Sequence, residues 1–267
     1  MSEKRLRLHA IGRSNNSQMK AVILAGGKGT RLAPYTTVLP KPLMPIGDMP
    51  ILEIMIRQLR AYGFSEIVLC VGYLGALLEA YFGKGEKLGI PISYSYEQEA
   101  LGTAGPIGLV PGLDCTFFAM NGDLLTTIDF SAMLRFHRRH GQIATVGLAN
   151  KTVKIDLGVI ETSEAHELIA YVEKPTYQYR VSMGIYAFEP DVLPYIRGTG
   201  AIDLPALILK LVRDGRRPMA FDSRCQWLDI GRADDYKIAH ELFQEQRATF
   251  LPPRATITQI ENERPRQ

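Results

Sequence analysis

Residues 20–31 read KAVILAGGKGTR, an apolar run that leads directly into a glycine-rich loop. The run 21–25 has the length and content of a strand that is buried on both faces in a parallel sheet. In the loop GGKGTR, glycines let backbone N–H groups approach an anion closely, and one lysine and one arginine add positive charge. The stretch therefore predicts a buried strand that ends in an anion-binding loop, suited to a nucleoside triphosphate.

Strand-like and helix-like segments alternate downstream of this strand. Apolar runs predict strands at residues 66–72, 92–96, 116–120 and 143–148. Apolar spacing and helix-ending glycines predict helices at residues 51–62, 74–82, 104–109 and 130–140. This alternation predicts right-handed βαβ units and an α/β fold with a Rossmann-like, doubly wound, mixed but mostly parallel sheet.

The pattern changes from residue 157 onward. Short strand-like runs are expected at 157–161, 168–172 and 182–188, and helices at 204–212 and 233–246. We expect this half to form an inserted α+β lobe wrapped on the first half. The expected organisation is a disordered extension at 1–18, one domain at 19–246 with halves 19–150 and 151–246, and a weakly ordered tail at 247–267.

The charge, apolar content and cysteine pattern of the chain exclude several classes of binding partner. The 267 residues carry a formal net charge of +3, and their lysines and arginines are scattered. This balance argues against nucleic acid as the principal partner but leaves small polyanions open. No apolar segment approaches the roughly 18 residues of a membrane helix, so no membrane partner is expected. The three cysteines form neither a metal-binding pattern nor a disulfide framework, which favours a cytoplasmic location.

Two common phosphate-binding motifs do not fit the glycine-rich loop. A dinucleotide fingerprint needs a third glycine where Leu32 stands, and an acidic residue after the next strand, which ends at Val71-Gly72. A Walker A loop needs Gly-Lys-Ser/Thr after four spacer residues, and this sequence has none. These absences count against a nicotinamide-dependent oxidoreductase. The loop is followed instead by LPKPL at 39–43, where prolines stiffen the backbone around Lys41.

Polar segments follow several predicted strands, and ligands of open parallel sheets bind at the carboxyl ends of the strands. The segments are GGKGTR, YEQEALGTAG, NGD and EKP. Asp123 in NGD is placed to hold a metal ion, although a turn or helix-capping role fits equally well. Asp229 lies in the apolar setting QWLDIG, and a buried carboxylate there needs a partner. His137 and His140, beside two arginines in a predicted helix, are interpreted as a solvent-exposed face.

The motifs GGKGTRL, LPKPL, LGTAG, NGD, EKP and WLDIG, in this order, resemble the sugar-1-phosphate nucleotidyltransferases, also called NDP-sugar pyrophosphorylases. The resemblance runs from Lys20 to Phe243 and implies the nucleotide-diphospho-sugar transferase fold. It implies Mg2+-assisted in-line attack of a sugar 1-phosphate on the α-phosphorus of a nucleoside triphosphate, giving an NDP-sugar and pyrophosphate. Because both substrates are polyanions, this chemistry needs positioning and charge neutralisation rather than a covalent nucleophile. Members are commonly oligomeric, so a homo-oligomer is possible.

The resemblance also implies roles for the residues that match the family motifs. As the catalytic pair, Arg31 is expected at the β- and γ-phosphates, and Lys41 near the α-phosphate and the sugar phosphate. The expected Mg2+ ligands are Asp123 and Asp229. The residues expected to bind the nucleotide are Leu24, Ala25, Gly26, Gly27, Gly29, Thr30, Glu97, Gly102 and Thr103. The residues expected to bind the sugar phosphate are Gly158, Glu173, Lys174 and Gly184.

The resemblance places the nucleobase against Glu97 and the backbone of Gly102. A carboxylate accepts two hydrogen bonds, which suits the adjacent N1–H and N2–H donors of guanine. With the LGTAG string, this favours GTP and a mannose-1-phosphate guanylyltransferase-like member. One alternative is a dTTP- or UTP-dependent glucose-1-phosphate nucleotidyltransferase, since pyrimidine-using members also carry Glu there. Another is a non-catalytic regulatory paralogue, against which the joint retention of the catalytic and metal residues argues. Ser182 stands where many members have Asn, which leaves the sugar open.

Overall fold

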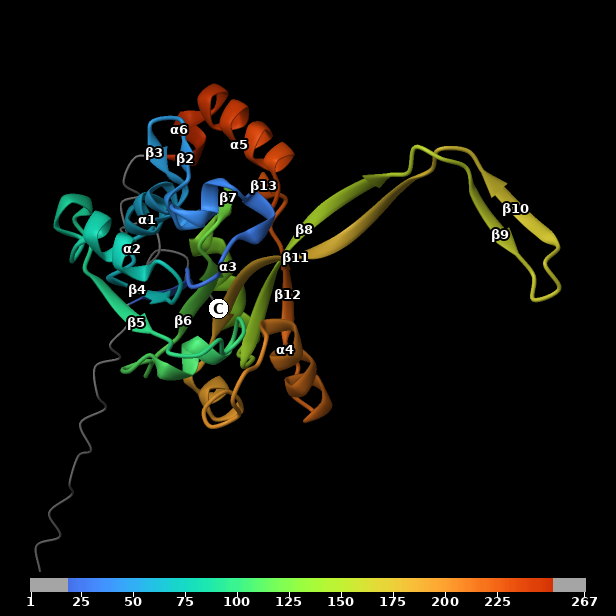
Figure 1. The fold of residues 1–267 in the computed structure, drawn as a ribbon. Coiled ribbons are helices and arrows are strands. Elements are labelled where there is room, and N and C mark those ends of the chain that lie inside the picture. Colours follow the sequence, from blue (N-terminus) through green and yellow to red (C-terminus); the bar gives the residue numbers. More distant parts are fainter. Residues whose placement is uncertain (1–18, 252–267) are drawn as a thin grey trace, which may run out of the picture.

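The centre of the structure is a seven-stranded sheet (Figure 1). The structure is a computed structural model that describes residues 19–251, so the expected extension 1–18 and the tail beyond 251 lie outside the described residues. In sheet order the strands are β12 (Met219–Asp222), β8 (Ala144–Lys154), β11 (Thr176–Phe188), β6 (Phe117–Asn121), β1 (Lys20–Leu24), β4 (Glu66–Val71) and β5 (Ile92–Tyr96). Strand β11 is antiparallel to both of its neighbours, and the other adjacent pairs are parallel. The expected α/β class with a mixed, mostly parallel sheet is confirmed.

Helices cover both faces of the sheet. One face packs against α1 (Ile51–Ala61), α2 (Gly75–Phe82) and α3 (Phe130–His140), and the other packs against α4 (Leu204–Arg213). The segment predicted as a short helix at 104–109 is a 3-10 helix, Gly105–Leu109. The remaining 3-10 helices are Thr30–Leu32, Tyr35–Thr37, Lys41–Leu43, Glu86–Leu88 and Pro190–Tyr195. Among the described residues, every helix falls short of the length and apolarity needed to cross a bilayer.

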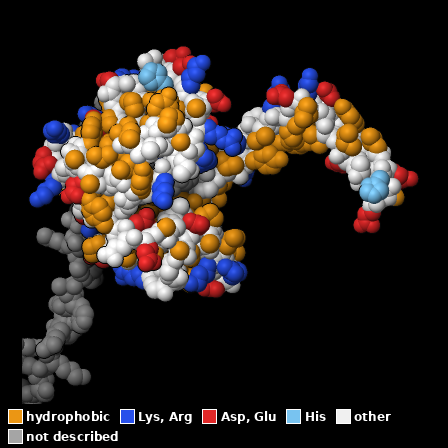
Figure 2. Space-filling view, in the orientation of Figure 1, with side chains coloured by type: hydrophobic (Ala, Val, Ile, Leu, Met, Phe, Trp, Pro, Cys, Tyr) orange, Lys and Arg blue, Asp and Glu red, His pale blue; other side chains and the backbone are white. Residues whose placement is uncertain are grey.

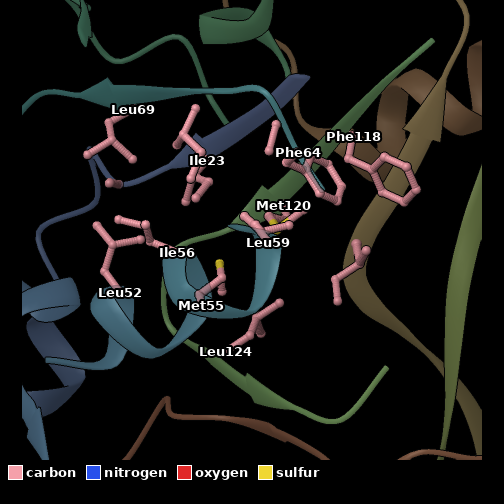
Figure 3. Close-up of a cluster of buried hydrophobic side chains, with 14 of the residues drawn as sticks. Ile23, Leu52, Met55, Ile56, Leu59, Phe64, Leu69, Phe118, Met120 and Leu124 are labelled. Atoms are coloured by element: carbon pink, nitrogen blue, oxygen red, sulfur yellow. The ribbon is translucent and has the colours of Figure 1, made fainter. Parts of the chain in front are cut away.

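Strand β1 shows why the opening apolar run is continuous rather than alternating. Its side chains point to both faces in turn, so Ala21 and Ile23 join the cluster beneath α1 to α3, while Val22 joins the cluster beneath α4. All three are fully buried. Figure 3 shows Ile23 packed among apolar side chains of α1, β4 and β6. A strand buried on both faces needs apolar residues at every position, as the sequence pattern predicts.

Two strands of the sheet continue beyond the body of the molecule. Residues 150–154 of β8 stay paired with 176–180 of β11, and beyond them β9 (Val159–Thr162) pairs with β10 (Leu168–Val172). We call residues 150–180 the arm, and Figure 1 shows it projecting from the sheet. The sequence places this segment in a lobe wrapped on the first half. In the structure it is extended, because the antiparallel ladder between residues 150–154 and 176–180 makes its base a two-stranded ribbon.

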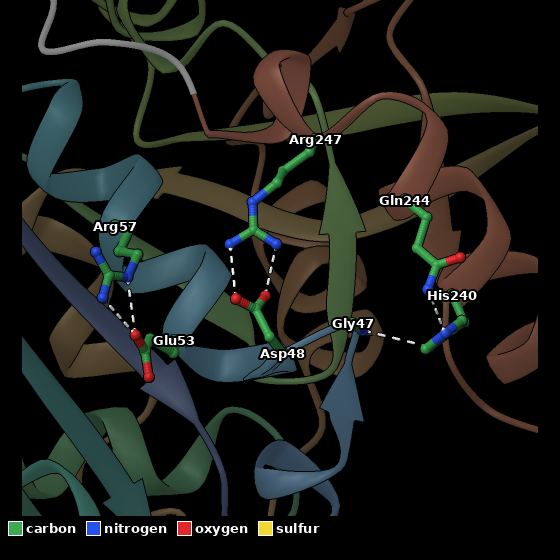
Figure 4. Close-up of polar contacts among 7 residues, drawn as sticks. All are labelled: Gly47, Asp48, Glu53, Arg57, His240, Gln244 and Arg247. Carbon is green, nitrogen blue, oxygen red and sulfur yellow. Dashed lines mark hydrogen bonds and ion pairs between the residues drawn. The ribbon is translucent and has the colours of Figure 1, made fainter.

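The C-terminal helices α5 (Ala233–Glu245) and α6 (Arg247–Phe250) pack against a small hairpin of β2 (Pro45–Ile46) and β3 (Met49–Pro50). The Arg247 guanidinium donates two hydrogen bonds to the Asp48 carboxylate, and the Gly47 N–H donates to Nδ1 of His240 at 3.3 Å (Figure 4). Phe250 is fully buried. Residues 247–251, which the sequence places in a weakly ordered tail, therefore pack as part of the domain.

The interpretation of His137 as solvent-exposed is wrong. Its side chain is fully buried, with Nδ1 2.8 Å from Oγ1 of Thr145 and Nε2 3.0 Å from Oε1 of Glu189. The cause is helical spacing: position 137 follows the buried Met133 and Leu134 by four and three residues, so it lies on the same face of α3. His140, in contrast, is exposed.

The contact between Glu189 and His137 is expected to make the free energy of unfolding depend on pH. The hydrogen bond from His137 is the main cause that lowers the pKa of Glu189 from its ordinary value of 4.5, with a second bond from Thr116, while burial opposes. A lowered folded-state pKa stabilises the fold above pH ~4.5, and this contribution is lost as the pH falls through the folded value. We expect Glu189→Gln to lower the free energy of unfolding at pH 7 and to have a smaller effect at an acid pH below the lowered folded-state pKa. Urea titrations at both pH values, with the exposed Glu241→Gln as control, measure this; an equal loss at both would contradict it.

Candidate active site

A cavity of about 880 Å³ opens at the carboxyl ends of β1, β4, β5 and β6. This is a typical volume for a site that encloses a small molecule. Eleven of the residues that the sequence predicts for a site line it: Leu24, Ala25, Gly26, Gly27, Gly29, Arg31, Lys41, Glu97, Gly102, Thr103 and Asp123. They come from segments spread over about a hundred residues of chain, and the parallel strands bring them together because their carboxyl ends share one edge of the sheet.

The glycine-rich loop is held at both ends by backbone contacts. The Ala25 N–H donates to the Cys70 carbonyl at 2.8 Å, which fixes the start of the loop beside β4. Gly29 has φ 62°, a left-handed conformation that favours glycine, and the buried Thr36 hydroxyl donates to its carbonyl at 2.8 Å. Thr36 is a supporting residue that the sequence analysis missed, because an isolated threonine has no motif. The loop is thus preformed around the cavity.

Lys41 and Asp123 form an ion pair at the cavity wall, between Nζ and Oδ2. Lys41 is buried in the 3-10 helix Lys41–Leu43, with a proline on each side as the sequence predicts. The other carboxylate oxygen of Asp123, Oδ1, is buried and accepts no hydrogen bond in the structure. A buried carboxylate oxygen without a partner is costly. Asp123 therefore offers one oxygen to a further positive ligand.

Asp229 reaches Asp123 through a short strand pairing that the sequence did not predict. Strand β13 (Trp227–Asp229) pairs with β7 (Leu124–Thr126), which places Asp229 opposite Leu124, and the Ile230 N–H donates to the Asp123 carbonyl at 3.2 Å. Burial, and then the negative charge of Asp123, raise the pKa of Asp229, while Lys41 and Arg31 partly offset them. Two carboxylates that repel one another in this way form a favourable place for a cation.

These two carboxylates fit a magnesium ion that shares its remaining positions with a substrate. Mg2+ prefers about six oxygen ligands and is commonly bound by one or two carboxylates, waters and substrate phosphates. The unpartnered Oδ1 of Asp123 is an oxygen of the kind required. Within residues 19–251, no group of three or more His, Cys, Asp or Glu side chains could hold a metal without such a substrate.

Arg31 lines the same cavity, and its guanidinium lies beside Gly231 of the WLDIG motif. A Cβ built at Gly231 would lie 3.3 Å from Nη1 of Arg31, so the absence of a side chain there leaves room for the guanidinium. Arg31 is exposed, in contrast to Lys41. The WLDIG segment therefore makes two contributions to the site. Asp229 provides a carboxylate near Asp123, and Gly231 leaves space for the Arg31 guanidinium.

The predicted base-binding segment is held over the first loop. A Cβ at Gly26 would lie 2.6 Å from Oε1 of Glu97, so the carboxylate lies directly on that glycine. Oε2 of Glu97 accepts a hydrogen bond from the Leu101 N–H at 3.2 Å. Asp203, at the start of α4, accepts bonds from the Thr103 N–H and hydroxyl at 2.9 and 3.2 Å. Asp203 is a second supporting residue that the sequence analysis missed, although Asp before a helix is a recognisable capping signal.

The remaining six predicted residues, Asp229 among them, do not line the cavity. Thr30 is exposed at the start of a 3-10 helix, and a Cβ at Gly184 would lie 2.6 Å from Nδ2 of Asn121, a lining residue. Gly158, Glu173 and Lys174 all lie on the arm. The Tyr171 ring packs on Gly158, and its hydroxyl donates to Oε2 of Glu173 at 3.3 Å. Lys174 Nζ is 3.9 Å from Oε1 of Glu173. These three residues thus lie together on the arm, which projects from the sheet (Figure 1), and none of them lines the cavity.

Comparison with known proteins identifies the family of the chain. Residues 20–246 match the family model described as "Nucleotidyl transferase". The chain is 37% identical over 240 residues to the UTP–glucose-1-phosphate uridylyltransferase of Synechocystis sp., covering 82% of the chain and 61% of the relative. It is 34% identical over 226 residues to the mannose-1-phosphate guanylyltransferase catalytic subunit beta of Xenopus tropicalis, covering 82% and 62%. The chain thus spans about three fifths of the length of these relatives.

Solved structures share the fold. The structure of HddC from Yersinia pseudotuberculosis aligns with a TM-score of 0.65 at 22% identity, covering 85% of this chain and 100% of that one. The structure of UDP-glucose pyrophosphorylase complexed with UDP-glucose aligns with a TM-score of 0.66 at 19% identity, covering 86% and 100%. At these identities the likeness establishes the architecture.

Proposed function

Because the chain belongs to the nucleotidyl transferase family, we propose that it transfers a nucleotidyl group from a nucleoside triphosphate to a sugar 1-phosphate. The products are an NDP-sugar and pyrophosphate. The observation that carries the proposal is the buried pair of Lys41 and Asp123, with one oxygen of Asp123 left unpartnered, at the end of a glycine-rich loop. A regulatory paralogue without catalysis would have no need to keep so costly a pair.

The reaction is an in-line displacement at phosphorus. An oxygen of the sugar phosphate forms a bond to the α-phosphorus as the bond from that phosphorus to the bridging oxygen of pyrophosphate breaks. Arg31, exposed at the cavity, binds the β- and γ-phosphates and stabilises the charge that develops on the leaving pyrophosphate. Lys41, held in place by Asp123, neutralises the α-phosphate oxygens and positions the attacking phosphate. Asp123 and Asp229 would hold Mg2+, which would supply further charge neutralisation.

The direct test is pyrophosphate release. GTP, UTP, dTTP, CTP and ATP are each incubated with mannose 1-phosphate or glucose 1-phosphate and Mg2+, and pyrophosphate is measured by a coupled assay. Formation of an NDP-sugar in at least one combination supports the proposal. Nucleotide binding without pyrophosphate release over a panel of sugar phosphates would favour the regulatory alternative.

We place GTP first among the nucleotides, on the strength of Glu97. Its carboxylate lines the cavity, and an acceptor of this kind suits the two adjacent donors of guanine. UTP is the second candidate, because the Synechocystis relative is named a uridylyltransferase.

We expect Glu97→Gln to lower kcat/KM for GTP relative to UTP by about tenfold, since an amide replaces one acceptor by a donor. The preference is measured as the ratio of kcat/KM values with the same sugar phosphate. Glu99→Gln is the matched control, because Glu99 also lines the cavity and is exposed. An unchanged ratio in Glu97→Gln would contradict the role of Glu97 in reading guanine.

A further inference from the structure

The segment that follows Arg31, residues 33–38, buries little of its apolar surface. Its side chains Tyr35 and Val38 are 64% and 75% exposed, and Thr36 is its buried member. Figure 2 shows hydrophobic side chains at the surface on this face of the body. A segment with few buried apolar contacts opens easily unless hydrogen bonds hold it. The position of this segment therefore depends on its hydrogen bonds to the rest of the site.

Tyr73, at the end of β4, joins the glycine-rich loop to this segment. The Tyr73 N–H donates to the Gly26 carbonyl at 3.3 Å, and its hydroxyl donates to the Thr37 carbonyl at 2.9 Å. The neighbouring Thr36 hydroxyl donates to the Gly29 carbonyl at 2.8 Å. The residues 26–29, 36–37 and 73 thus form a closed ring of covalent and hydrogen bonds. We call it the hydrogen-bonded ring, and Tyr73 also lines the cavity.

The turn that carries Tyr73 has an uncommon backbone conformation. The next residue, Leu74, has φ 57°, in the left-handed region that non-glycine residues adopt rarely. The Gly75 N–H closes the turn by donating to the Gly72 carbonyl at 3.1 Å. Backbone strain of this kind concentrates at functional sites, where the surrounding structure maintains it. The turn therefore holds Tyr73 in one place at the cavity wall.

Arg31 depends on the hydrogen-bonded ring for its position. Its side chain is exposed and, among residues 19–251, takes part in no hydrogen bond and no ion pair. Lys41, in contrast, is fixed by its ion pair with Asp123. The ring holds the chain on both sides of Arg31, at Gly29 and at Thr37. A shift of about 1 Å in a catalytic group can cost about a hundredfold in rate, so this hold on the backbone matters for the reaction.

We propose that Tyr73 is a positioning residue for nucleotidyl transfer, which acts by holding the backbone on either side of Arg31. The inference rests on the proposed function, in which Arg31 stabilises the charge of the leaving pyrophosphate. Tyr73 belongs to none of the motifs that carry the family resemblance. Its role follows from the hydrogen-bonded ring, which its hydroxyl closes at the Thr37 carbonyl.

Tyr73→Phe removes only the hydroxyl that closes the ring. We expect kcat to fall about tenfold while KM for the nucleoside triphosphate changes less than about threefold, because the loss falls on the transition state. The Tm should stay close to that of the wild type, since a solvent-exposed hydrogen bond contributes little net stability. Tyr94→Phe is the matched control: the Tyr94 hydroxyl also donates to a backbone carbonyl, that of Gly83 at 2.7 Å, but Tyr94 does not line the cavity. A wild-type kcat in Tyr73→Phe, or equal losses in both variants, would overturn the proposal.

A double-variant cycle with Arg31→Met tests whether Tyr73 acts through Arg31. If the ring serves to place the guanidinium, then Tyr73→Phe has almost nothing left to disturb once the guanidinium is gone. We therefore expect Tyr73→Phe to lower kcat by less than about twofold in the Arg31→Met background, against about tenfold in the wild type. Losses that multiply would show that the Tyr73 hydroxyl acts independently of Arg31, and they would overturn the proposal.

Limited proteolysis provides a measurement that does not depend on activity. Trypsin cleaves after Arg31, and the peptide that ends there can be followed by mass spectrometry. Local opening of the segment should make this cleavage several-fold faster in Tyr73→Phe than in the wild type or in Tyr94→Phe. Equal cleavage rates would overturn the proposal. Faster cleavage in Tyr73→Phe, with no pyrophosphate release by the wild type on any substrate, would contradict the proposed function and still support the hold of Tyr73 on the Arg31 segment.

Discussion

Asp123→Asn is expected to lower kcat/KM for nucleotidyl transfer by at least about a thousandfold, with most of the loss in kcat. Asp123 is the point where three parts of the site meet: it pairs with Lys41, neighbours Asp229 through the β7–β13 pairing, and keeps one buried oxygen unpartnered. An amide of the same shape removes the negative charge that Lys41 and a cation both need. The protein should still fold, because the substitution also removes the repulsion with Asp229.

The loss of metal binding in Asp123→Asn should also be visible in thermal stability. Mg2+ together with a nucleoside triphosphate should raise the Tm of the wild type and leave that of Asp123→Asn almost unchanged, since a ligand stabilises only the state that binds it. Asp129→Asn is the matched control, because the Asp129 side chain caps α3 by accepting from the Ala132 N–H at 2.8 Å, and Asn caps equally well. Wild-type turnover in Asp123→Asn would show that the metal is held elsewhere.

Lys41→Met should lower kcat/KM by about a hundred- to a thousandfold, through loss of the charge that faces the reacting phosphate. It should also destabilise the protein, by about 2–3 kcal/mol, because breaking a largely buried ion pair leaves the Asp123 carboxylate without compensation. The two effects have separate causes. The double variant Lys41→Met/Asp123→Asn should therefore regain most of the stability and none of the activity.

Lys28→Met is the control for Lys41→Met. It removes one positive charge from the cavity without removing the buried lysine beside Asp123. Lys28 also lines the cavity but is exposed, so its removal should weaken substrate binding modestly and leave kcat close to that of the wild type. Equal losses of kcat in Lys28→Met and Lys41→Met would indicate that the site uses general positive charge rather than a placed lysine. Urea titrations and initial-rate kinetics on the same preparations separate stability from catalysis.

The parts of the site that follow long strands were predictable from the sequence. A buried strand such as β1 is recognisable from a continuous apolar run, and a segment such as NGD, directly after β6, must lie at the same edge of a parallel sheet. The glycine-rich loop and Asp123 were identified for this reason, from local sequence and one general property of parallel sheets. Lys41, in a 3-10 helix, was assigned instead from the resemblance of the LPKPL motif to the family.

The parts that depend on short or polar elements were not predictable. Strands β7 and β13 have three residues each, too few to show a period, yet their pairing brings Asp229 to Asp123. The supporting contacts of Thr36 and Asp203 join residues that no motif connects. His137 was wrongly predicted to be exposed because its neighbours in the sequence, Arg138 and Arg139, are charged, although His137 itself lies on the apolar face of α3.

The α/β class and the order of the motifs follow from the sequence alone, and they suffice to suggest a site for polyanionic substrates. The position of the residues predicted to bind the sugar phosphate is visible only in the tertiary structure. EKP follows strand β10, as a sequence pattern can indicate, but no pattern specifies that β8 and β11 remain paired beyond the sheet and carry Lys174 away from the cavity of its own chain. The physical reason is that a backbone ladder forms between almost any side chains, so polar residues such as those at 150–154 continue a strand without an apolar signal.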